Sequence, residues 1–103
     1  MNPSETFSVD KAVQDIREEL EHIYDNLEQG KDVSPGQRCR CEGQIEMLLS
    51  QQVIERVFFE SMIDKLYAGV YGQVVTNAFW QWGRDDERFY LPLVMQAAPV
   101  YKG

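Results

Sequence analysis

The first thirty residues hold the pattern that most limits how this chain can fold, an apolar seam at helical spacing. Apolar residues recur at alternating steps of four and three: Val9, Val13, Ile16, Leu20, Ile23 and Leu27. This spacing returns an apolar side chain to the same helix face at each turn. It predicts an amphipathic helix over Val9–Gln29, with Ser8 as N-cap and Gly30 as the residue after the C-cap, so that helix and caps span 8–30. The seam can pack within its own domain or pair across a homodimer, and we favour packing within the domain.

Acidic side chains gather on the face opposite this seam. Residues 1–30 carry eight Asp or Glu against only Lys11 and Arg17, and so hold −6 of the net charge of −7. At about 100° per residue, the acids of the predicted helix project away from the apolar stripe. We interpret this acid face as the candidate partner-binding surface, and it consists of Asp15, Glu18, Glu21, Asp25 and Glu28.

A second helix is predicted over Pro35–Ser50. Ser34 is a good N-cap, Pro35 suits the first helical position, and Gln37 is placed to close a capping box. Its predicted inner residues are Cys41, Ile45, Leu48 and Leu49. The short connector predicts an antiparallel hairpin with the first helix.

The hairpin brings positive charge close to the acid face. We expect Arg38 and Arg40 to lie beside Asp25 and Glu28, where they offset the acid charge. Exposed pairs of this kind contribute at most about 1 kcal/mol each.

The apolar phase slips after Ser50, which favours a break near Gln51 and Gln52 and a third helix over residues 54–71. One continuous helix from Pro35 to Val70 is the alternative, and Gly69 and Gly72 end either version. The predicted inner residues of the third helix are Val57, Phe58, Met62, Ile63, Leu66, Tyr67 and Val70.

The last third is rich in aromatic residues. Residues 79–82 and 88–91 flank a polar turn, which indicates an aromatic β-hairpin or extended arm within 74–103. A helix over Val74–Trp82 is also compatible with the spacing. On a strand, Trp80 and Trp82 share a face, which either covers the helical core or forms an exposed anchor for a partner. The predicted fold is mainly α, a helical hairpin with a third helix and this C-terminal segment.

The size and charge of the chain narrow its class. With 103 residues it is expected to form one domain after a short tail at 1–7. Its apolar runs are far shorter than the roughly 20 residues of a membrane span, and its start lacks the basic and apolar regions of a signal peptide. We therefore expect a cytoplasmic protein that contacts no membrane. The acidic balance argues against direct nucleic-acid binding, which needs clustered Lys and Arg.

Residues able to carry chemistry are few. Cys39, Cys41 and His22 are too few for a structural zinc site, and on a helix the two thiols point about 200° apart. We interpret Cys41 as a core residue and His22 as a solvated one. We expect no catalytic residue, metal or cofactor.

Because the sequence holds no catalytic motif, hypotheses about its function depend on its predicted surfaces. We hypothesise a non-enzymatic module whose acid face binds a basic protein. One version is an inhibitor that fills the nucleic-acid groove of its target, as an anti-defence protein of a mobile element does. The alternatives are a self-associating homodimeric module, built on the seam or on Trp80 and Trp82, and a small thiol or acid–base enzyme using Cys39.

Overall fold

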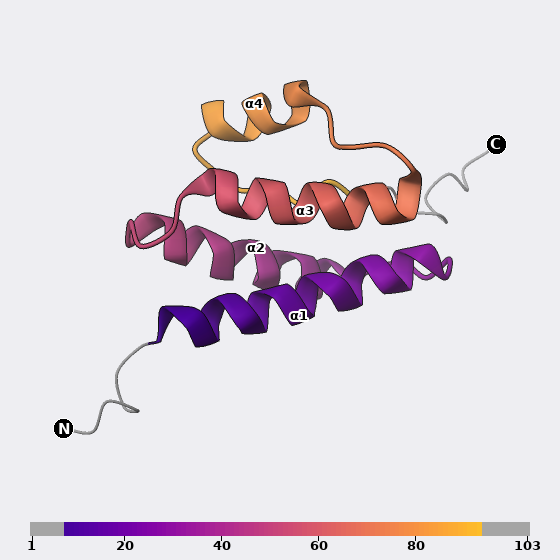
Figure 1. Ribbon diagram of the computed structural model, residues 1–103, viewed down its shortest axis with the longest axis horizontal. Coiled ribbons are helices and arrows are strands. Elements are labelled where there is room, and N and C mark those ends of the chain that lie inside the picture. Colours follow the sequence, from indigo (N-terminus) through magenta and orange to yellow (C-terminus); the bar gives the residue numbers. More distant parts are fainter. Residues whose placement is uncertain (1–7, 94–103) are drawn as a thin grey trace.

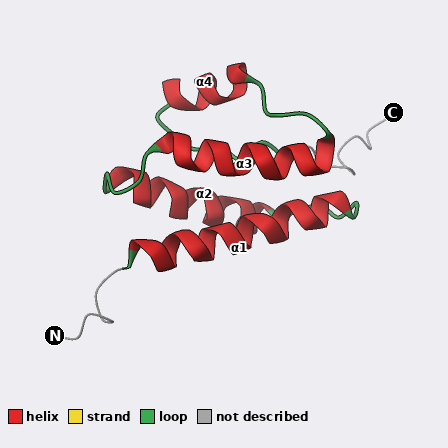
Figure 2. Cartoon of the chain, viewed as in Figure 1, coloured by secondary structure: helices red, strands yellow, loops and turns green. Residues whose placement is uncertain are grey.

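The structure is a computed structural model that describes residues 8–93, and its described part is helical with no strand (Figures 1 and 2). The helices are α1 (Val9–Glu28), α2 (Pro35–Ser50), α3 (Arg56–Tyr71) and α4 (Asn77–Asp85). The first and third run in the same direction, the second runs opposite to both, and α4 runs back over α3 on the side away from α1 (Figure 1). No helix in residues 8–93 has both the length and the apolar character needed to cross a membrane.

The predicted helix ends are largely confirmed. Ser8 Oγ accepts from the Lys11 N–H at 3.2 Å, and Ser34 Oγ accepts from the Gln37 N–H at 3.1 Å, so both serines cap their helices. The capping box is wrong in its second half, because the Gln37 side chain donates to Glu19 at 2.9 Å instead of turning back to Ser34. Helix α3 begins at Arg56, so the predicted break is present.

The seam of α1 is packed inside the chain. Ile16, Leu20, Ile23 and Leu27 are buried, and they meet buried residues of α2 and α3 in one core. Four of the six seam residues therefore pack within the domain, as the favoured alternative predicted, whereas Val9 and Val13 are half-buried. Cys41, Ile45 and Leu48 of α2 are buried as predicted.

The inner face of α3 differs from the prediction at its first turn. Val57 and Phe58 are 54% and 40% exposed, whereas Phe59 is fully buried. Phe59 packs edge-to-face on Phe89 with ring centroids 6.4 Å apart. The C-terminal segment therefore contributes a core residue, Phe89, on the Phe59 side of α3. This long-range contact explains why Phe59 faces inward and Phe58 does not.

The predicted strand at residues 79–82 is wrong, because these residues belong to α4. Thr76 Oγ1 accepts from the Phe79 N–H at 3.2 Å and starts this helix. The alternative prediction of a helix over 74–82 is therefore correct in type, although the observed helix begins and ends three residues later. Residues 86 and 87 form a turn after α4, and residues 88–93, which we call the arm, belong to no helix and pair with no strand in the described chain. The remainder of the predicted hairpin or arm, residues 94–103, lies outside the described residues.

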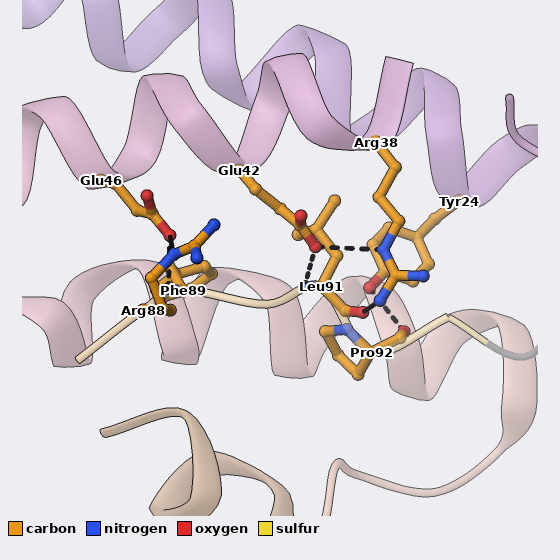
Figure 3. A network of polar contacts seen from close by, with 8 residues as sticks. All are labelled: Tyr24, Arg38, Glu42, Glu46, Arg88, Phe89, Leu91 and Pro92. Carbon is orange, nitrogen blue, oxygen red and sulfur yellow. Dashed lines mark hydrogen bonds and ion pairs between the residues drawn. The ribbon is translucent and has the colours of Figure 1, made fainter. Parts of the chain in front are cut away.

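The arm is held by side chains of α2, as Figure 3 shows. Glu46 accepts from the Phe89 N–H and Glu42 from the Leu91 N–H, both at 2.8 Å. Arg38 donates to the Leu91 carbonyl at 3.2 Å, and the Tyr24 hydroxyl donates to the Pro92 carbonyl at 2.9 Å. With Phe89 and Leu91 fully buried, the arm fills the space between α2 and α3.

A buried carboxylate joins α3 to α4. Glu60 is 3% exposed and forms ion pairs with Arg56 and Arg84. Arg56 Nε lies 3.3 Å from Glu60 Oε2 but is not aligned for a hydrogen bond. The Arg56 guanidinium also donates to the Arg88 carbonyl, so one cluster ties α3, α4 and the arm together.

Candidate protein-interaction surface

The acid face of α1 is open to water along its length. All five of its residues are exposed: Asp15, Glu18, Glu21, Asp25 and Glu28. Lys11 lies 3.2 Å from Asp15. Two neutral side chains donate at 2.9 Å to the acid face, Gln14 to Glu18 and Gln29 to Asp25. Among residues 8–93, no cation lies within ion-pair distance of the last four acids. The face therefore presents uncompensated negative charge.

The expected screening of this face by α2 is wrong. Arg40 instead lies 3.6 Å from Glu19, and Arg38 donates to Glu42 at 3.0 Å. Arg38 is engaged by the arm instead, because its guanidinium also donates to the Leu91 carbonyl at 3.2 Å (Figure 3).

Trp80 and Trp82 do not share a face, which corrects the strand-based expectation. Two helical residues project about 200° apart, and accordingly Trp80 is 5% exposed and Trp82 53%. The Trp80 indole N–H donates to Asp64 at 3.3 Å, so this tryptophan belongs to the core. Trp82 stacks on Tyr90 with ring centroids 4.5 Å apart. Of the two tryptophans, Trp82 alone is exposed enough to contact a partner protein.

A groove between α1 and α3 was missed in the sequence. It has a volume of about 630 Å³, and we call it the α1–α3 groove. Its lining residues are Arg17, Glu21, Glu55, Val57, Phe58, Ser61, Met62, Lys65 and Leu66. A smaller hollow of about 220 Å³ shares Glu21, Lys65 and Leu66 and extends it toward Asp25, Glu28 and Val70. The exposure of Val57 and Phe58, which were predicted to be core, is what opens this groove.

The thiols belong to α2, whereas the histidine is an exposed residue of α1, one turn from Glu18 and from Asp25. Cys39 is exposed and Cys41 is fully buried, as expected for a core residue. Burial is the main cause that raises the pKa of the Cys41 thiol to about 12. His22 is exposed, with its Nε2 3.4 Å from Asn26 Nδ2. In residues 8–93, no three His, Cys, Asp or Glu side chains are grouped closely enough to share a metal ion.

The sequence matches no protein-family model, and neither the curated proteins nor the solved structures yield a match to this chain. The acid face and the α1–α3 groove are the surface features from which a function can be inferred.

Proposed function

We propose that this chain is a non-enzymatic interaction module that binds a basic surface of another protein through the acid face of α1. The observation that carries the proposal is that Glu18, Glu21, Asp25 and Glu28 are all exposed and that no cation of residues 8–93 lies within ion-pair distance of them. Charges in this state are free to meet positive charges on a partner, which raises both the encounter rate and the specificity of binding.

The distribution of charge supports binding more than general solubility. Residues 1–30 hold −6 of the net charge of −7, although acidic residues also occur throughout the rest of the chain. Downstream acids such as Glu42, Glu46 and Glu60 are each paired with an arginine, whereas most of the acid face is not. An inhibitor that covers a nucleic-acid-binding groove is one form of this activity, because such grooves carry clustered Lys and Arg.

The test compares two variants with the same change in charge. Glu18→Lys with Asp25→Lys alters the acid face, and Asp85→Lys with Glu87→Lys alters exposed positions at the end of α4. Immobilised protein is exposed to cell lysate, and captured basic proteins are identified by mass spectrometry at low and high salt. The proposal expects a basic protein that is lost at high salt and lost with the α1 variant, but kept with the α4 variant. Equal capture by both variants contradicts it.

A self-associating module is the second candidate, and the exposed stack of Trp82 on Tyr90 favours it. Aromatic residues of this kind are enriched in interface hot spots. Light scattering at micromolar concentration should then give a dimer that Trp82→Gln converts to monomer. A 12.0 kDa monomer for the unchanged chain removes this candidate.

A further inference from the structure

The three long helices create grooves between neighbours, and within residues 8–93 the arm fills the groove between α2 and α3 but not the one between α1 and α3. The arm occupies the space between α2 and α3, where Phe89 and Leu91 reach full burial. On the other side of α3, the groove toward α1 is left with a volume of about 630 Å³. Val57 and Phe58 stand exposed there in the described structure, so an apolar surface lies directly beside the acid face.

The apolar side of this groove follows a strip of α3 that winds slowly around the helix, by about 40° for every four residues. Phe58, Met62, Leu66 and Val70 follow one another at intervals of four residues and all line the groove or its extension. Phe58 is exposed, Met62 is buried at the floor of the groove, and Leu66 and Val70 are half-buried. Twelve residues of helix span about 18 Å, or a little over three turns. A strip of this length and direction suits the apolar stripe of another helix, which would pack as the fourth helix beside α1 and α3.

The other side of the groove is acidic and runs parallel to this strip. Glu21, Asp25 and Glu28 of α1 lie one turn apart and line the groove or its extension. Lys65 is the basic residue common to both hollows, and Arg17 lies at the Glu55 end. A helix that fits must therefore carry an apolar stripe and, beside it, a basic stripe that faces residues 21–28.

We infer that the α1–α3 groove binds a basic amphipathic helix of a partner protein, which places apolar side chains over Phe58, Met62 and Leu66 and Lys or Arg against Glu21, Asp25 and Glu28. This inference rests on the proposed function, because it specifies that the basic surface of the partner protein is an amphipathic helix. It adds that apolar burial in the groove, and not charge alone, holds the partner.

The probe is a fluorescein-labelled synthetic peptide of 18 residues with leucine on one helical stripe and lysine elsewhere. Two comparison peptides separate the causes of binding: a scramble of the same composition, which keeps the charge and destroys the stripe, and a version with glutamate in place of lysine. Fluorescence anisotropy with the full chain gives each Kd. We expect the basic amphipathic peptide to bind roughly tenfold or more tightly than either comparison peptide.

Variants of the protein locate the binding. Phe58→Gln removes the exposed ring without changing charge, and Val74→Gln makes the same kind of change at a residue that is 62% exposed and outside the groove. We expect Phe58→Gln to weaken binding roughly tenfold and Val74→Gln to leave it unchanged. Ser61→Lys is a second groove variant at an exposed helical position, and it should weaken binding by placing a like charge against the peptide.

The outcomes separate this inference from the function beneath it. Equal binding of the scrambled peptide, still lost with Glu18→Lys and Asp25→Lys, overturns the groove but keeps the acid face. Equal binding of the glutamate peptide overturns the charge complementarity on which both rest. Circular dichroism of each variant checks that the helices are intact, and an unchanged Kd in folded Phe58→Gln and Ser61→Lys contradicts the inference.

Discussion

The Glu42 carboxylate accepts a hydrogen bond of 2.8 Å from the backbone N–H of Leu91, 49 positions further along the chain. Glu46, one turn later on α2, does the same for Phe89. Four residues of helix rise about 6 Å, and alternate residues of an extended chain lie about 6.7 Å apart. The two carboxylates therefore match the spacing of the arm's N–H groups, and they supply the acceptors that a second strand would otherwise provide.

Removing this acceptor should destabilise the chain. Glu42→Ala leaves the N–H of fully buried Leu91 without its partner, so we expect a loss of about 1–3 kcal/mol in the free energy of unfolding, measured in urea. Amide hydrogen exchange of Leu91 should accelerate in the same variant. Glu18→Ala, a change at an exposed acid, is the control and should stay within about 0.5 kcal/mol. Equal stability of the two variants would contradict the account of the arm.

Glu60 should be the acidic side chain most sensitive to substitution. It is 3% exposed and its carboxylate lies between Arg56 and Arg84. Glu60→Gln keeps the size but turns amide hydrogens toward a guanidinium, so we expect a loss of about 2–4 kcal/mol in urea unfolding. Glu21→Gln, at an exposed position, should change stability by less than about 0.5 kcal/mol. A loss for Glu60→Gln no larger than for Glu21→Gln would show that the buried pair is not formed.

Stability should fall at alkaline pH. Burial raises the pKa of Cys41 from its usual 9.0 to about 12, and it raises the pKa of Tyr24 above its usual 10.0. Above pH 9 the unfolded chain releases the Cys41 proton while the folded chain keeps it, so stability that is fully present below pH 9 is lost as the pH rises toward 12. For Cys41 alone this amounts to about 1.4 kcal/mol per pH unit.

Substitution of the two cysteines isolates this contribution. Cys41→Ala should flatten the decline in unfolding free energy between pH 9 and 12, as followed by urea unfolding at each pH. Cys39→Ala, which removes a thiol already exposed in the folded protein, should leave the slope as it is. An identical slope in all three proteins would mean that Cys41 is not buried as described.

The tryptophans should differ sharply in fluorescence quenching. Trp80 is 5% exposed and Trp82 is 53% exposed, so iodide should quench the emission of Trp80→Phe strongly and that of Trp82→Phe weakly. Trp80→Phe also loses the indole bond to Asp64 and should unfold at lower urea. Similar quenching constants in the two variants would favour a strand over α4.

The sequence predicted best where local signals were strong. The apolar seam, the caps Ser8 and Ser34 and the break after Ser50 all depend on residues within a few positions of one another. Two of the errors share another cause, which is contact with the arm. Phe59 is buried instead of Phe58 because Phe89 packs on it, and Arg38 does not pair with the acid face because the arm engages it through a carbonyl.

The candidate interaction surface likewise has one part that local sequence predicts and one part that depends on long-range contacts. The exposure of the acid face follows from helical spacing alone, so its five residues were found without a structure. The α1–α3 groove depends on the rotation of α3 about its axis, which is fixed by partners more than 20 residues away, such as Arg84 on Glu60. No pattern within α3 itself distinguishes Phe58 from Phe59.

The most direct test of the central claim is to map peptide binding on the protein by NMR. The ¹⁵N-labelled chain is titrated with the basic amphipathic peptide at low salt and again at about 0.5 M salt, where exposed charges are strongly screened. We predict that the largest amide shifts occur at Glu21, Asp25, Phe58, Met62 and Leu66, and that high salt reduces them. Shifts centred instead on Trp82 and Tyr90, or absent from α1 and α3, would contradict the account.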